Sequence, residues 1–221
     1  MENLSKSDTL RSGNYQAVVC GVSAGGLDAL KTLLSIVTSD FEPALVIVQH
    51  LHPQQDDFLV AHLGKVCRLP VIEAREKEAV KGGVVYLAPA NYHLLIETDK
   101  TFSLCADEKV NFSRPSIDVL FETAAEAYGA DLIGMILTGA SSDGSVGLRR
   151  IKEKGGLAIV QDPRTAEYPA MPMAALEETQ VDHILSIDRI GRLLGALGRP
   201  VQPHPSGQES ESNGQDSDCR R

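Results

Sequence analysis

Short, almost wholly apolar runs alternate along this chain with segments in which apolar residues recur every three or four positions. The apolar runs span residues 17–22, 44–48, 132–137 and 157–160. Such runs are typical of parallel strands that are buried on both faces. Helical spacing occurs over residues 25–37, over 117–128, and at Val146, Leu148 and Ile151. The alternation predicts βαβ units, and therefore an α/β fold with a doubly wound, mainly parallel sheet flanked by helices.

Weaker patterns complete this prediction. Apolar residues from Phe58 to Val66 share one helical face, residues 71–74 suggest a short strand, and Met173 and Leu176 suggest a helix. A last strand is expected over 184–187. A terminal helix follows, which we expect Asp188 to cap and Gly198 to close.

The pattern changes between residues 82 and 104. Three short strand-like segments, 84–88, 93–96 and 101–104, are separated by the turn-forming residues 89–91 and 98–100. Short strands joined by tight turns are typical of antiparallel pairing. We therefore expect a small antiparallel hairpin insert here.

The two ends of the chain differ in composition from the middle. Residues 1–14 are polar, and residues 199–221 combine three prolines with many Ser, Gln, Glu, Asp and Asn residues. Such composition does not support a packed core. The sequence thus predicts a flexible leader over 1–14, one folded domain over 15–198 and a disordered polar tail over 199–221.

Charge and composition restrict the function classes. The net charge is −9, aromatic residues make up 5%, and Trp is absent. An acidic chain without a basic, aromatic-rich stripe is not expected to bind nucleic acid. No signal core or membrane-length apolar run is present in the sequence. The four cysteines are scattered without a CxxC pair, a pattern typical of reduced thiols. We expect a cytoplasmic protein without direct membrane insertion, cofactor or metal.

The most informative stretch is Gly21-Val22-Ser23-Ala24-Gly25-Gly26, at the end of the first predicted strand. Gly-x-Ser-x-Gly between a strand and a helix is the pattern of a nucleophile elbow, which exposes a serine hydroxyl on a tight turn. Two other interpretations fit these residues alone: a glycine-rich phosphate cradle, or a strand-to-helix turn capped by a serine.

Two further polar residues also follow predicted strands. His50 comes after the strand 44–48, and Asp143 comes after the strand 132–137. Carboxyl ends of parallel strands meet at one edge of a sheet, so Ser23, His50 and Asp143 are expected to form a nucleophile, base and acid set.

Each of these residues has a structural alternative. His50 is also explained as a hydrogen-bonded histidine at a strand end, or with His52 as a metal pair that lacks a third ligand. Asp143 is also explained as a helix N-cap. Asp162, at another strand end, competes for the role of the acid, although Pro163 favours a turn there.

Six motifs together resemble the catalytic domain of the chemotaxis protein-glutamate methylesterase family, CheB. The motifs stand in the family's order over about residues 16–197. They are Gly21–Gly26, Val48-Gln49-His50, Tyr86–Pro89 with His93, Arg114–Phe121, Leu137–Gly144, and Gln161-Asp162 with Met171-Pro172.

The resemblance implies that Ser23 is the nucleophile, His50 the base and Asp143 the orienting acid. It also implies hydrolysis of γ-glutamyl methyl esters on the cytoplasmic helices of a methyl-accepting chemoreceptor, or of a similar methylated signalling protein. A counterpart methyltransferase would act in the same pathway, and glutamine deamidation is implied as a second activity. His93 and Arg114 are expected at the periphery of the site.

This chain departs from the family pattern at two places. Ala24 replaces the usual Thr after the nucleophile, and Ala140-Ser141 replaces the usual Met-Gly. Backbone N–H groups survive such changes, so Ala24 and Ala140 are expected to supply the oxyanion hole. The family usually carries an N-terminal receiver domain. With only residues 1–14 there, we expect a stand-alone esterase domain.

Three other functions remain open at this point. One is a serine hydrolase that acts on another ester or amide. A second is a non-catalytic or weakly active scaffold of the same fold that docks receptors or signalling partners, suggested by Ala24 and Ala140-Ser141. The third, a nucleotide-binding protein, follows from the phosphate-cradle interpretation of the glycine-rich turn.

Overall fold

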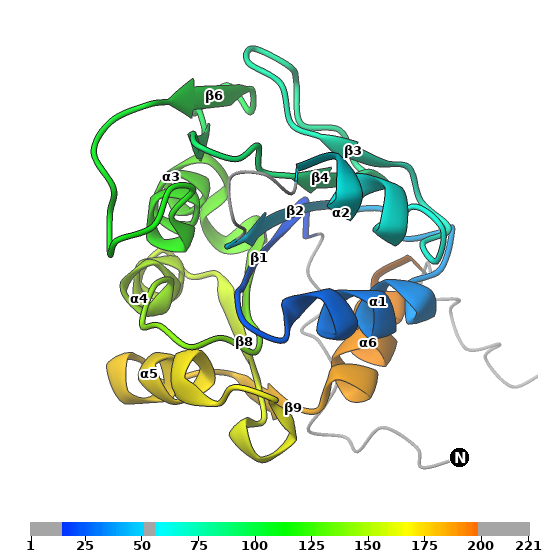
Figure 1. Ribbon diagram of the computed structural model, residues 1–221, viewed down its shortest axis with the longest axis vertical. Helices are drawn as coiled ribbons and strands as arrows, with labels where there is room; N and C mark the ends of the chain where they lie inside the picture. The colour runs from blue at the N-terminus through cyan, green and yellow to red at the C-terminus, as the bar shows by residue number, and fades with distance from the viewer. Residues whose placement is uncertain (1–14, 51–55, 199–221) are drawn as a thin grey trace, which may run out of the picture.

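The computed structural model describes residues 15–50 and 56–198, in which seven parallel strands form one sheet covered by helices on both faces (Figure 1). The strand order is β3-β4-β2-β1-β7-β8-β9. The strands are β1 (Ala17–Val22), β2 (Ala44–Gln49), β3 (Val71–Glu73), β4 (Val85–Leu87), β7 (Leu132–Ile136), β8 (Leu157–Gln161) and β9 (His183–Leu185).

The chain moves outward from β1 in both directions, with β2 on one side and β7 on the other. This reversal makes the carboxyl end of β1 a topological switch point, where open α/β sheets form their binding sites. The predicted doubly wound parallel sheet is confirmed.

Alternate residues of each central strand face opposite cores. Val18, Cys20 and Val22 of β1 belong to one buried cluster, and Ala17 and Val19 belong to the other. The first core is closed by α1 (Gly26–Ile36), α2 (Asp56–Leu63) and α6 (Ile187–Gly195). The second is closed by α3 (Ile117–Tyr128), α4 (Ser145–Glu153), α5 (Ala170–Glu178) and the hairpin of β5 (His93–Ile96) and β6 (Phe102–Cys105).

Two sequence-based expectations were wrong in detail. The first of the three short segments, β4, pairs in parallel with β2 and β3, so only β5 and β6 form the antiparallel hairpin. All three residues of β4 are buried, because β4 lies inside the large sheet. The last strand ends at Leu185, and Ser186 is the N-cap of α6 in place of Asp188. Serine readily takes the extended backbone of a cap. With the cap at Ser186, Ile187 becomes the first residue of the helix, and it is buried there.

Short 3-10 turns complete the description: η2 (Gly129–Asp131), η3 (Pro163–Thr165) and η4 (Ala196–Gly198). The predicted leader 1–14, the tail 199–221 and the alternative metal partner His52 lie outside the described residues. Within the described ranges, none of the helices has the length and apolarity needed to cross a bilayer.

Candidate active site

Ser23 lies on the sharp turn between β1 and α1, at the centre of the sheet. Its N–H donates to Thr138 O (3.0 Å), and its own carbonyl accepts from the N–H of Gly26 (2.9 Å). Gly25, the N-cap of α1, has a φ of 74°, a left-handed conformation that glycine adopts without strain. A Cβ added there would lie 2.8 Å from Glu167 Oε2. The backbone angle therefore favours glycine at the second glycine of the Gly-x-Ser-x-Gly pattern, and a side chain there would also displace Glu167.

Thr138, which follows β7, is hydrogen-bonded to this turn. Its hydroxyl lies 3.0 Å from Ala24 O and 3.3 Å from Tyr168 O, and it accepts from Tyr168 N–H at 2.9 Å. Gly139 comes next, and a Cβ built there would lie 2.9 Å from Ser23 Cβ and collide with Met171. The segment after β7 thus packs directly against the serine.

His50 and Asp143 form a hydrogen-bonded pair at the ends of the two strands that flank β1. His50 follows β2, Asp143 follows β7, and His50 Nε2 lies 2.9 Å from Asp143 Oδ2. A carboxylate only accepts hydrogen bonds, so Nε2 carries the proton and Nδ1 is left as the basic nitrogen. The Oγ of Ser23 makes no hydrogen bond to the part of the chain that the structure describes.

Asp143 is buried and accepts five hydrogen bonds, more than an N-cap role alone would need. Burial by itself raises the pKa of this carboxyl, but the hydrogen bonds it accepts, led by that from His50, outweigh burial and lower the pKa. Asp143 is thereby held as an anion. The five donors are His50 Nε2 (2.9 Å), Ile117 N (2.7 Å), Asp118 N (3.2 Å), Ser116 Oγ (2.9 Å) and Asn111 Nδ2 (3.1 Å).

Two aspartates exchange caps between α3 and α4. Asp143, just before α4, accepts from the first N–H groups of α3, whereas Asp118, in the first turn of α3, accepts from the N–H of Gly147 in α4 (2.7 Å). Helix N-termini favour negative charge. Burial is the main cause that raises the pKa of Asp118 to about 6, the Gly147 hydrogen bond opposes it, and the charge of Asp143 adds to it. Asn111 Nδ2 bridges both carboxylates, at 2.7 Å from Asp118 and 3.1 Å from Asp143.

The two expected oxyanion donors have backbone N–H groups that are unpaired within the described part of the chain. Neither Ala24 N–H nor Ala140 N–H donates to an acceptor within residues 15–50 and 56–198. Ala24 directly follows Ser23, and Ala140 follows Gly139, which packs against Ser23 Cβ. An N–H pair of this kind is the donor set that an oxyanion hole uses.

His93 and Arg114 brace the segment before α3. Buried His93 accepts from Ser116 N–H at Nδ1 (3.1 Å), and its Nε2 faces Glu108 O (3.0 Å). Arg114 Nη1 donates to the carbonyls of Ala106 (2.6 Å) and Asp107 (2.8 Å). Ser116 therefore contacts both His93, through its N–H, and Asp143, through its hydroxyl. A peripheral role for His93 and Arg114 stays a prediction.

Asp162, the alternative acid, lies elsewhere. Its carboxylate caps η3 through Arg164 N–H (3.0 Å) and pairs with the Arg164 guanidinium (2.6 Å). Its turn role is confirmed. Among the described residues, no three His, Cys, Asp or Glu side chains are grouped closely enough to hold a metal ion.

Sequence reasoning assigned no role to four polar residues of this cluster: Asn111, Ser116, Asp118 and Thr138. The last three lie within the motifs Arg114–Phe121 and Leu137–Gly144. Asn111 and Ser116 precede an amphipathic helix, where polar residues usually cap the helix itself. Here they instead donate to a carboxylate from a distant part of the chain. Their position before α3, and for Ser116 the motif Arg114–Phe121, gave a signal that did not identify the partner carboxylate.

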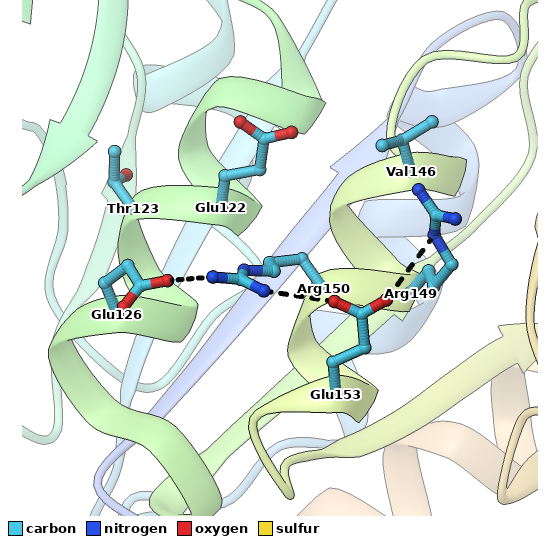
Figure 2. Close-up of a pocket in the computed structure, with 7 residues that line it drawn as sticks. All are labelled: Glu122, Thr123, Glu126, Val146, Arg149, Arg150 and Glu153. Carbon is cyan, nitrogen blue, oxygen red and sulfur yellow. Dashed lines mark hydrogen bonds and ion pairs between the residues drawn. The ribbon is translucent and has the colours of Figure 1, made fainter.

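A groove between α3 and α4 is separate from this cluster (Figure 2). Arg150 of α4 reaches Glu126 of α3 (2.7 Å) and Glu153 of its own helix (3.1 Å), and Arg149 also faces Glu153. These side chains are close to half exposed, so each pair contributes little. The groove is lined by exposed ion pairs, one of which joins α3 to α4.

A second, mostly apolar hollow borders Ala140. It is formed with the start of α5, where Tyr168 and Met173 are 42% and 49% exposed. Because Ala140 lines this hollow, a ligand bound at the N–H of Ala140 would also contact an apolar surface.

Comparison with known proteins shows which family this chain matches. Residues 18–194 match the sequence model of the CheB methylesterase family. A Leptospira interrogans protein, named as a candidate protein-glutamate methylesterase/protein-glutamine glutaminase, is 57% identical over 180 residues, or 81% of this chain and 93% of that protein. A Mesorhizobium japonicum protein named protein-glutamate methylesterase/protein-glutamine glutaminase is 38% identical over 82% of this chain and 54% of its own length. The CheB methylesterase catalytic domain of Thermotoga maritima superposes with a TM-score of 0.79 at 35% identity, covering 85% of this chain and 100% of that domain.

Proposed function

Because this chain belongs to the CheB methylesterase family, we propose that it is a carboxylic ester hydrolase that removes methyl groups from γ-glutamyl methyl esters of a protein substrate. The observation that carries this proposal is the His50–Asp143 pair at 2.9 Å, in the segments that follow the two strands flanking β1. Serine needs a neighbouring base to act as a nucleophile at neutral pH, and a carboxylate-held imidazole supplies one.

The first half of the reaction forms an acyl-enzyme. Asp143 holds the His50 Nε2–H, so Nδ1 takes the proton of the Ser23 hydroxyl as Oγ attacks the ester carbonyl carbon. The carbonyl oxygen becomes an oxyanion, which accepts hydrogen bonds from the N–H groups of Ala24 and Ala140. His50 then returns the proton to the leaving oxygen, and methanol departs. A serine ester of the substrate's glutamate remains.

The second half regenerates the enzyme. His50 takes a proton from water as the water oxygen attacks the serine ester, and returns it to Ser23 Oγ as the glutamic acid leaves. The acid then loses a proton to solvent and becomes the carboxylate. A glutamine amide passes through the same intermediate with ammonia as the leaving group, which extends the proposal to deamidation. Both activities stand in the names of the relatives.

The proposed substrate is the cytoplasmic part of a methyl-accepting chemoreceptor, or of a similar methylated signalling protein. A methyltransferase would supply the esters, and the reaction would take place in the cytoplasm. The replacement of Thr by Ala24 removes one side-chain hydroxyl but leaves both backbone donors in place. Stabilisation of the oxyanion then depends on the backbone N–H groups of Ala24 and Ala140, without a side-chain hydroxyl at position 24.

Methanol release from a methylated receptor tests the proposal. Wild type is expected to release methanol, and Ser23→Ala is expected to release none above background. Ser35→Ala, which removes an exposed hydroxyl from α1, is the matched control and should behave as wild type. Labelling of Ser23 by a fluorophosphonate separates a hydrolase from a scaffold of the same fold. Equal methanol release by wild type and Ser23→Ala would remove Ser23 from the mechanism.

A further inference from the structure

The segment that donates to Asp143 also presents the most exposed aromatic side chain among the described residues. Phe112 is 97% exposed, and Val110 beside it is 37% exposed. Both lie between β6 and α3, in a segment that arches away from the sheet before it returns to the helix (Figure 1). An isolated aromatic ring in water gains nothing from folding, because it buries no surface. A partner that covered the ring would gain the burial energy that the fold leaves unused.

The backbone under Phe112 is unusual for its residue type. Val110 and Ser113 exchange two backbone hydrogen bonds, at 3.2 and 2.8 Å, and the two residues between them, Asn111 and Phe112, have φ values of 49° and 62°. Two consecutive positive φ values are those of a type I′ turn, for which Asn followed by Gly is preferred. Asn suits the first position, but a bulky residue at the second is strained. Glycine would fit this fold better than phenylalanine does.

The turn is tied to the active site and has a defined position. Asn111 Nδ2 donates to Asp143 (3.1 Å) and to Asp118 (2.7 Å), so the residue next to Phe112 is fixed on the acid that holds His50. The site has a second apolar border in the hollow of Tyr168 and Met173 beside Ala140. Phe112 is thus a fully exposed aromatic ring on a strained turn, next to a residue that is bonded to Asp143. Aromatic side chains of this kind are enriched at protein interfaces.

We propose that Phe112 is a docking anchor for the protein substrate, packing on the apolar surface of the helix that carries the methylated glutamates. This inference rests on the proposed function. Its occupant follows from the chemistry: an esterified glutamate is neutral and ends in a methyl group, so a methylated helix offers an apolar surface to the ring. The product carries a new carboxylate, and the enzyme has a net charge of −9. Substrate is thereby favoured over product on this surface.

The turn geometry supplies the test, because Phe112→Gly removes the ring while giving the backbone its preferred residue. We expect Phe112→Gly to raise KM for methylated receptor about tenfold, the effect of losing one interface anchor, with kcat and the rate of fluorophosphonate labelling of Ser23 unchanged. Its thermal midpoint should equal or exceed that of wild type. Phe112→Tyr should keep the wild-type KM. Ile184→Ala, which trims a half-exposed apolar side chain on the edge strand β9, is the remote control.

The outcomes separate this inference from the proposed function. An unchanged KM in Phe112→Gly, with active wild type, overturns the anchor and leaves the esterase proposal intact. Slower fluorophosphonate labelling of Phe112→Gly would also overturn it, because the residue would then act on Ser23 and not on the substrate's surface. No methanol release by wild type would overturn both.

Discussion

Replacing Asp143 by asparagine should cost this protein both activity and stability, whereas replacing Ser23 by alanine should cost activity alone. The reason lies in the five hydrogen bonds that the buried carboxylate accepts, of which three go to Oδ1 and two to Oδ2. An amide of the same shape has one acceptor oxygen and one NH₂ group. Whichever way the amide is oriented, NH₂ faces at least one buried backbone N–H of α3.

The magnitude follows from what is lost. If the amide oxygen keeps the Oδ1 position, Ile117 N–H loses its 2.7 Å acceptor and His50 loses its carboxylate. Hydrogen bonds to charged groups contribute about 1.5–3 kcal/mol each. Two of them amount to about 3–6 kcal/mol, a large part of the roughly 5–15 kcal/mol that stabilises a domain. Urea denaturation followed by circular dichroism measures this loss.

Activity should fall through the histidine tautomer. An NH₂ group facing His50 Nε2 favours a lone pair on that nitrogen and the proton on Nδ1, which removes the base. In serine proteases this change lowers kcat by about 10⁴-fold, and we expect a similar loss of methanol release here.

Ser23→Ala is the control, since Ser23 Oγ makes no hydrogen bond within the described residues and its loss should leave the urea midpoint unchanged. If Asp143→Asn unfolds at the same urea concentration as wild type, the carboxylate does not stabilise α3 as argued. Wild-type activity in that variant would show that it does not orient His50.

Three further predictions follow from contacts around the site. Thr138→Val removes the hydroxyl that bonds Ala24 O and Tyr168 N–H, and should lower the free energy of unfolding by about 1–3 kcal/mol and reduce kcat. Thr138→Ser should keep both hydrogen bonds, so equal denaturation curves for the two variants would contradict this reasoning. Gly139→Ala places a methyl group 2.9 Å from Ser23 Cβ, so fluorophosphonate labelling should slow severalfold or more, and unchanged labelling would show that the turn yields freely. Asp118 has its pKa raised from 3.8 to about 6, so its stabilising contribution is complete below about pH 4 and is lost as pH rises through 6. The unfolding free energy of wild type relative to Asp118→Asn should therefore fall by about 2–3 kcal/mol between pH 4 and pH 7, and a difference that does not change with pH would refute the raised pKa.

The long strands of this fold could be predicted because they are buried on both faces, and such strands are recognisable without knowledge of their neighbours. The segment 17–22 needs only its own composition to be identified as β1. The same reasoning assigned segment 84–88 to the antiparallel insert, because β4 is short and flanked by turns, as a hairpin strand would be. Its parallel pairing with β2 and β3 is a long-range choice that local sequence does not encode.

The site likewise contains residues that the sequence could identify and contacts that it could not. Ser23, His50 and Asp143 follow strands, and the geometry of a parallel sheet brings the ends of neighbouring strands together. The structure places His50 against Asp143, as that reasoning expected. The contacts of Asn111 and Ser116 with Asp143 could not be predicted, because they depend on how α3 packs beside α4.

The exchange of caps between α3 and α4 has a consequence for how relatives of this protein should be interpreted. Asp143 closes the start of α3 whether or not the enzyme turns over substrate, so selection for folding alone would retain it. Ser23 Oγ carries no such structural duty within the described chain. In a descendant that has lost its activity, the aspartate should outlast the serine. The presence of the serine, and not of the aspartate, is then the better indicator that such a descendant is still an enzyme.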